Sequence, residues 1–105
     1  MFSYKIDRAF QTISIQFQGD LDIEVSEIME EEIIPALESC IDVEFDFKGV
    51  PFVDSTGIGI FINLIEILKK KDAEIKIRNI QPLVREVFEM LQLKEIMGEK
   101  VKLVG

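Results

Sequence analysis

Histidine is absent from this chain of 105 residues, and cysteine occurs only once. Without histidine there can be no serine–histidine catalytic pair and no metal site with an imidazole ligand, so a serine nucleophile would need another base. The lone Cys40 cannot form an intramolecular disulfide, which suits a reducing compartment or indifference to redox state. We expect Cys40 to be a small buried hydrophobe rather than a reactive thiol.

Long apolar runs are also missing. The longest apolar stretch, around residues 58–68, is interrupted by Asn63 and Glu66 and is shorter than the roughly 20 residues that a membrane span requires. The first residues, MFSYKID, alternate and carry charge, so they lack the apolar region of a signal peptide. We therefore expect a cytoplasmic protein that does not enter a membrane.

Basic residues are few, with 12 against 20 acidic ones and a formal net charge of -8. This charge repels nucleic acid and anionic lipid, and it suits a partner with a basic surface. A chain of this length with 48% hydrophobic residues can bury one compact core but is too short for two ordinary domains. We expect a single domain over residues 1–105 that does not bind nucleic acid directly.

The hydrophobic pattern predicts strands that alternate with helices. Alternation at 2–6 and 13–17 predicts an antiparallel hairpin, and a period of three to four at 25–40 predicts an amphipathic helix. Asp20 or Asp22 can cap that helix, and Pro35 should kink or end it. Further strands are expected at 43–47, 75–77 and 101–104, and further helices at 58–71 and from Pro82 onward. The helix from Pro82 should bury Val84, Val87, Phe88 and Leu91.

This order, β-β-α-β-α-β-α-β, predicts an α/β fold with a mixed sheet of four to five strands. Strands that are separated by helices run parallel through right-handed crossovers, whereas the opening hairpin is antiparallel. Polar residues alternate with Ile13, Ile15 and Phe17 and again with Ile75 and Ile77. One face of the sheet should therefore be mostly solvated, with the helices mainly on the other face.

The segment FVDSTGIG at residues 52–59 joins an apolar strand to an apolar helix. Ser55 therefore lies close to a helix N-terminus, where unpaired backbone N–H groups favour a phosphate or another acceptor. Its ordinary structural role would be that of an N-cap, but a cap needs no apolar surroundings. The apolar residues around it are Val50, Phe52, Val53, Ile58 and part of Phe61. Some of them should be exposed, because open α/β sheets bind their ligands at this end of the strands.

A hydroxyl among apolar side chains makes a docking surface that a single phosphate would disrupt. Phosphorylation of Ser55 would add about -1.5 to -2 charges beside Asp54. Burying such charge unpaired costs on the order of several kcal/mol, and about 3 kcal/mol already changes an affinity more than a hundredfold. The segment therefore favours a binding protein that is switched by phosphorylation, and not an enzyme.

Other chemistries at this segment have less support. Lys48 is the closest cation in sequence, but the spacing does not place it against Ser55 as a base. Gly57 and Gly59 belong to neither a dinucleotide-binding nor a P-loop fingerprint, so a tight turn and close helix packing explain them better than a nucleotide site. A metal ion at Asp20, Asp22 and Glu24 is equally weak, because capping and a solvated face account for these residues.

Three segments together resemble STAS domains, specifically the bacterial anti-sigma-factor antagonists. They are GDLD at 19–22, FDF at 45–47 and FVDSTGIG at 52–59, and the similarity extends over essentially the whole chain, including Asn79 and the helix that starts at Pro82. The resemblance implies a regulator of transcription in stress response or sporulation, bound by an anti-sigma factor that is also a serine kinase. The unmodified form would bind this kinase and free the sigma factor. Phosphorylation of Ser55 would block the binding, and a PP2C-type phosphatase would restore it.

The resemblance also implies roles for single residues. Ser55 matches the phosphoacceptor, Asp54 the preceding acid and Asp22 a loop acid near the partner surface, while Thr56 is a less expected second acceptor. The implied partner surface consists of Asp22, Asp54, Ser55, Thr56, Gly57, Ile58 and Phe61, with an exposed helix flank that begins at Ile58. No cofactor or metal is implied for this chain, because ATP and magnesium would belong to the kinase.

Two other hypotheses remain. A STAS domain could be a scaffold subunit of a signalling complex or a partner of a transport system, although a scaffold more often carries an extra N-terminal region. Hydrolysis at Asp54 or Ser55 is the enzymatic hypothesis, and for it we expect no turnover.

Overall fold

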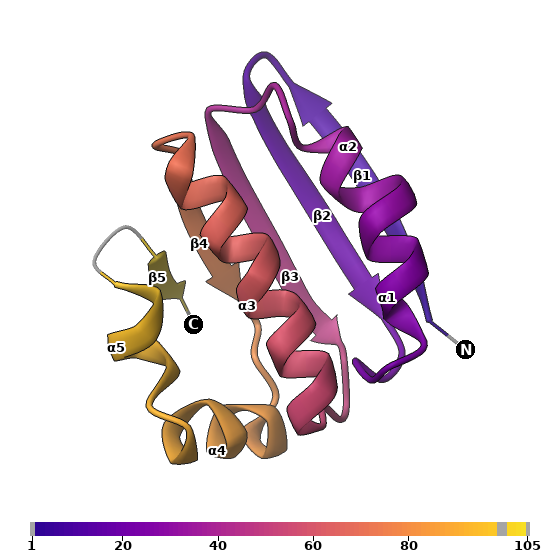
Figure 1. The fold of residues 1–105 in the computed structure, drawn as a ribbon, viewed down its shortest axis with the longest axis vertical. Helices are drawn as coiled ribbons and strands as arrows, with labels where there is room; N and C mark the ends of the chain where they lie inside the picture. Colours follow the sequence, from indigo (N-terminus) through magenta and orange to yellow (C-terminus); the bar gives the residue numbers. More distant parts are fainter. Residues whose placement is uncertain (1, 99–100, 105) are drawn as a thin grey trace.

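The computed structural model describes residues 2–98 and 101–104, which form one five-stranded sheet in the order β1-β2-β3-β4-β5. The strands are β1 (Ser3–Ala9), β2 (Thr12–Gln18), β3 (Asp42–Gly49), β4 (Glu74–Arg78) and β5 (Val101–Val104). β1 and β2 pair antiparallel, and the later neighbours pair parallel (Figure 1). The predicted α/β fold with a mixed sheet is confirmed.

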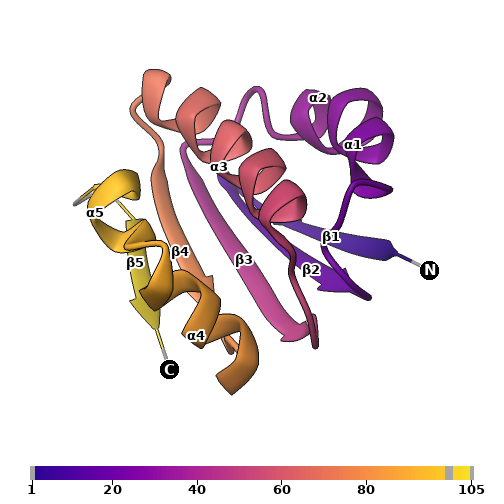
Figure 2. The ribbon, with the colours of Figure 1, turned by 60° about the horizontal axis from the view of Figure 1, so that its bottom comes forward.

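Helices cover one face of the sheet (Figure 2). They are α1 (Val25–Ile28), the π-helical segment η1 (Met29–Ile33), α2 (Ile34–Ala36), α3 (Ser55–Lys70), α4 (Pro82–Met90) and α5 (Leu93–Met97). The sequence did not predict α5, because five residues are too few to display a helical period. Within the described residues, no helix is long and apolar enough to cross a membrane.

Burial alternates along the strands and separates the two faces. Ile13, Ile15 and Phe17 of β2 are buried, whereas Gln16 and Gln18 are exposed. The same alternation continues in β3 and β4, where successive side chains point to opposite faces. The prediction of one solvated face, with the helices mainly on the other, is confirmed.

An aromatic cluster fixes α3 on the sheet. The ring of Phe61 lies 5.1 Å from those of Phe45 and Phe47 and 6.2 Å from that of Phe17, in edge-to-face geometry. Such pairs contribute about 0.5–1.5 kcal/mol each beyond the burial of their area. The N-terminus of α3 is therefore held firmly at the carboxyl end of β3.

Pro35 ends the first helical region one residue later, at Ala36, as predicted. The π-helical segment η1 ends at Ile33, two residues before Pro35. Proline has no N–H to donate and its ring crowds the carbonyl four residues earlier, and a π-helical turn accommodates an interruption of this kind.

The predicted burial of individual side chains is mostly confirmed. Cys40 is buried, and its Sγ donates to the carbonyl of Leu37 at 2.9 Å. In α4, Val84 and Phe88 are buried and Val87 is half-buried. The predicted burial of Leu91 is wrong, since this residue is 42% exposed. The reason is that α4 ends at Met90, so Leu91 no longer continues its buried face.

Candidate partner-binding site

The loops that follow β2 and β3 are joined by backbone hydrogen bonds. The N–H of Leu21 donates to the carbonyl of Phe52 at 3.0 Å, and the N–H of Asp54 donates to the carbonyl of Leu21 at 3.2 Å. Leu21 and Val53 thereby form a short parallel bridge. The bridge brings two predicted site regions, around Asp22 and Ser55, to the same edge of the sheet.

Asp54, and not Ser55, is the N-cap of α3. Asp54 has an extended backbone, and its Oδ1 accepts a hydrogen bond of 2.7 Å from the N–H of Gly57. The structural role considered for Ser55 is therefore wrong, because the carboxylate one residue earlier already caps the helix. Ser55 is the first residue of α3 and is exposed, as is Thr56. The hydroxyl that the sequence singled out is thus accessible at a helix N-terminus.

Gly57 permits a very close contact between α3 and the loop after β2. A Cβ at this position would lie 1.8 Å from the carbonyl oxygen of Leu21 and 2.8 Å from the backbone nitrogen of Asp22. At Gly59, by contrast, a Cβ would meet nothing within 4 Å. Close packing therefore explains Gly57 but not Gly59.

The predicted exposed flank of α3 is wrong at its two apolar members. Ile58 is 1% exposed and Phe61 is fully buried, and Gly57 is buried as well. Ile58, Phe61, Ile65 and Leu68 recur at helical spacing and form the face of α3 that packs on the sheet. The same period was visible in the sequence and could have placed Ile58 in the core.

The exposed apolar side chains at this edge come from the loops instead. Phe52 is 51% exposed, which confirms that part of the apolar group around Ser55 faces solvent, whereas Val50 and Val53 are buried. Sequence reasoning missed Ile23, which is 60% exposed in the loop that the Leu21 bridge joins to Phe52. Non-local pairing creates this neighbourhood, so no local pattern signals it.

Asp22 shapes its loop rather than capping the helix. Its Oδ1 accepts a hydrogen bond of 2.9 Å from the N–H of Glu24, which forms a turn closed by the side chain. The N-cap of α1 is Glu24 and makes no side-chain cap bond, so the expected capping by Asp20 or Asp22 is wrong. Asp22 is half-buried and remains at the edge that holds Ser55. In the part of the chain that the structure describes, no group of three or more acidic or cysteine side chains could hold a metal ion.

The sequence model of the STAS domain family matches residues 4–104. This chain belongs to the STAS domain family. Its relatives include the anti-sigma-B factor antagonist of Bacillus subtilis, with 27% identity over 93 residues that cover 89% of this STAS chain and 85% of the relative.

Solved structures of other proteins share the fold. The unphosphorylated anti-sigma factor antagonist SpoIIAA superimposes with a TM-score of 0.77 at 21% identity, over 98% of this chain and 88% of that one. The phosphorylated form of the Bacillus cell fate determinant SpoIIAA gives a TM-score of 0.69 at 22% identity, over 87% of this chain and 85% of that one. A sulfate transporter family protein from Wolinella succinogenes gives a TM-score of 0.75 at 14% identity, over 90% of this chain and 78% of that one.

Proposed function

We propose that this chain, as a single STAS domain, is an anti-sigma-factor antagonist that is switched by phosphorylation of Ser55. The unmodified form binds an anti-sigma factor that is also a serine kinase, and the sigma factor is thereby released. One observation carries the proposal: Ser55 is exposed at the first position of α3, beside the half-buried cap Asp54. The name of the Bacillus subtilis relative and the two phosphorylation states of SpoIIAA support it.

The switch acts through charge at an apolar contact. Phe52 and Ile23 present exposed apolar side chains on the joined loops beside Ser55. A partner that covers these side chains also removes water from the nearby hydroxyl of Ser55. A phosphate there would add about -1.5 to -2 charges next to the Asp54 carboxylate, whose Oδ1 already accepts from Gly57. Because apolar side chains of the partner would cover this position, the added charge would be buried there without a counterion, and the complex should dissociate.

In this mechanism the chain is a substrate and a ligand, not an enzyme. The kinase transfers the γ-phosphoryl group of ATP to Oγ of Ser55, and the hydroxyl proton leaves with the base of the kinase. A PP2C-type phosphatase hydrolyses the resulting ester and restores the binding form. Thr56 is exposed beside Ser55 and is a second, less favoured acceptor.

The partner contacts follow from exposure. Asp22, Asp54, Ser55 and Thr56 are the predicted contact residues that reach the surface at this edge. Gly57 is buried, and it allows the start of α3 to pack closely against the backbone of Leu21. With a net charge of -8, the chain suits a partner with basic residues at the contact. It acts on transcription in the cytoplasm through this partner and does not bind DNA itself.

Calorimetric titration with the anti-sigma factor encoded by the same genome tests the proposal. Unmodified protein and the Ser55→Ala variant should bind, whereas phosphorylated protein and Ser55→Asp should bind at least about a hundredfold more weakly. After incubation with the kinase and ATP, mass spectrometry should find the phosphate on Ser55, including in a Thr56→Ala control. Equal affinity of the phosphorylated and unmodified forms would refute the proposal.

A STAS partner of a transport system, or a scaffold subunit, is the alternative. It has the support of the shared fold with the sulfate transporter family protein. Copurification separates the two functions, since a transport partner would be recovered with membrane components and an antagonist with a soluble kinase.

A further inference from the structure

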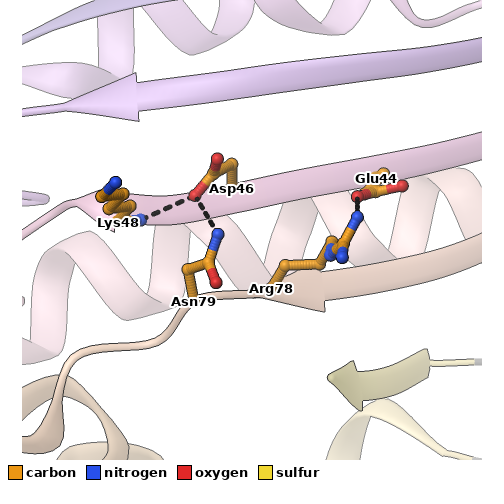
Figure 3. Close-up of polar contacts among 5 residues, drawn as sticks. All are labelled: Glu44, Asp46, Lys48, Arg78 and Asn79. Carbon is orange, nitrogen blue, oxygen red and sulfur yellow. Dashed lines mark hydrogen bonds and ion pairs between the residues drawn. The ribbon is translucent and has the colours of Figure 1, made fainter. Parts of the chain in front are cut away.

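The loop between β4 and α4 is attached to the end of β3 by two side-chain hydrogen bonds. Nδ2 of Asn79 donates to Oδ1 of Asp46 at 3.1 Å, and Nε2 of Gln81 donates to the carbonyl of Lys48 at 2.6 Å. The same Oδ1 of Asp46 accepts from the N–H of Lys48 at 2.9 Å, so that one carboxylate oxygen links both segments (Figure 3).

Asn79 is suited to this position by its backbone as well as by its amide. Its φ is 59°, in the left-handed region that Asn, Asp and Gly tolerate better than other residues. The left-handed residue turns the chain out of β4, and the bond to Asp46 fixes the direction of the turn. Ile80 and Val84 are buried on either side of the start of α4, so the loop is anchored from below.

The attached loop carries an exposed apolar side chain to the edge where Ser55 lies. Leu83, in the first turn of α4, is 65% exposed. Figure 1 shows α4 beginning near the segment that joins β3 to α3, and the bond from Gln81 to Lys48 holds the start of α4 close to the end of β3. Two loops and the first turn of α4, at the carboxyl ends of the parallel strands, therefore each present one exposed apolar side chain: Ile23, Phe52 and Leu83.

We infer that Asn79 is a positioning residue for partner binding, which holds Leu83 in place as the third apolar contact for the anti-sigma factor. The inference rests on the proposed function and extends the contact surface to the first turn of α4. A partner that fits this surface has apolar side chains to cover Ile23, Phe52 and Leu83, and basic residues opposite the surrounding carboxylates. Because the loop is ordered before binding, little conformational freedom is lost in the complex.

An exchange of amide and carboxylate tests the role of Asn79. The single variant Asn79→Asp keeps a residue that tolerates positive φ but places two carboxylates against each other. Its affinity for the anti-sigma factor should fall about tenfold, as measured by calorimetry. In the double variant Asp46→Asn/Asn79→Asp, the amide at position 46 donates to the carboxylate at position 79 while its oxygen still accepts from Lys48. The affinity should return to within about twofold of the wild type.

The neighbouring ion pair supplies a matched control. Nη1 of Arg78 lies 2.5 Å from Oε1 of Glu44, two residues before Asp46 in β3 and one residue before Asn79 at the end of β4 (Figure 3). The Glu44→Gln variant loses this pair without touching the loop, and its affinity should stay within about twofold of the wild type. Hydrogen exchange of the amides of residues 80, 81, 83 and 84 should be faster in Asn79→Asp and should return to the wild-type rate in the double variant.

The outcomes separate the inference from the function on which it rests. If the wild type binds and Asn79→Asp binds equally well, or if the double variant does not recover, the inference is overturned and the proposed function stands. If Glu44→Gln weakens binding as much as Asn79→Asp does, the effect belongs to the sheet and the inference is also overturned. If Ser55→Asp binds as tightly as the wild type, the proposed function itself fails.

Discussion

The first turn of α3 rests on the carbonyl of Leu21, with no room for a side chain at Gly57 between them. This contact joins the helix that carries Ser55 to the loop that carries Asp22 and Ile23. Together with the hydrogen bonds from Leu21 to the loop after β3, it makes the two loops a single rigid platform. The position of the exposed serine relative to its apolar neighbours therefore depends on backbone contacts.

Gly57→Ala should destabilise the fold strongly, because its Cβ would lie 1.8 Å from a backbone oxygen that cannot move aside. Overpacking of this kind costs about 1–3 kcal/mol or more. Gly59→Ala is the matched control in the same helix. It meets nothing within 4 Å and should stabilise the fold by about 0.5–1 kcal/mol. Urea unfolding measures both changes, and equal stabilities of the two variants would contradict the contact described here.

Asp54→Ala should lower the stability by about 0.5–2 kcal/mol, because it removes the N-cap of α3. Asn caps helices as well as Asp does, so Asp54→Asn should retain most of the stability while removing the charge. Thermal unfolding of the three proteins distinguishes the cap from the charge. A loss as large in Asp54→Asn as in Asp54→Ala would show that capping is not the reason for the effect.

Phe52→Ala should weaken binding of the anti-sigma factor by about tenfold, a loss of about 1.4 kcal/mol, because it removes an exposed aromatic contact. Phe10 is the matched control, since it is a fully exposed aromatic residue in the turn between β1 and β2, at the opposite end of the sheet. Phe10→Ala should bind like the wild type. If both variants lost the same affinity, the contact surface would not be the edge that contains Ser55.

Cys40 should react slowly with thiol reagents in the folded protein and rapidly after unfolding. Burial raises the pKa of the Cys40 thiol above its ordinary value of 9.0, so the folded state favours the neutral form. The stability that the buried Cys40 contributes is therefore present at pH below 9.0, and it is lost as the pH rises through the raised pKa of the thiol. Urea unfolding of the wild type and Cys40→Ala at neutral and alkaline pH measures this loss. A wild type that gained stability relative to Cys40→Ala at alkaline pH would contradict it.

The sequence predicted the order of strands and helices, because hydrophobic periods of two and of three to four report directly on local structure. It also drew attention to Ser55, whose place between a strand and a helix is a local property. It did not reveal that Ile23 and Leu83 share one edge with Phe52, since loops far apart in sequence meet there. The prediction that Ile58 and Phe61 contact a partner is wrong, because both belong to the apolar face of α3 that packs on the sheet.

Asp54 and Ser55 illustrate a second limit. Both residues can accept hydrogen bonds from the start of a helix, so the sequence alone could not decide which is the cap. The extended backbone of Asp54 and its bond to Gly57 decide it in the structure. The consequence is functional, because a serine that served as the cap would not have an uncommitted hydroxyl.

The bridge between Leu21 and Val53 has an evolutionary consequence. Main-chain groups hold the platform together, so the side chains that protrude from it can mutate without disturbing the architecture beneath them. After gene duplication, the two copies can therefore come to bind different partners through a few substitutions of these exposed side chains. Each copy would then avoid binding the partner of the other copy, although both keep the same fold.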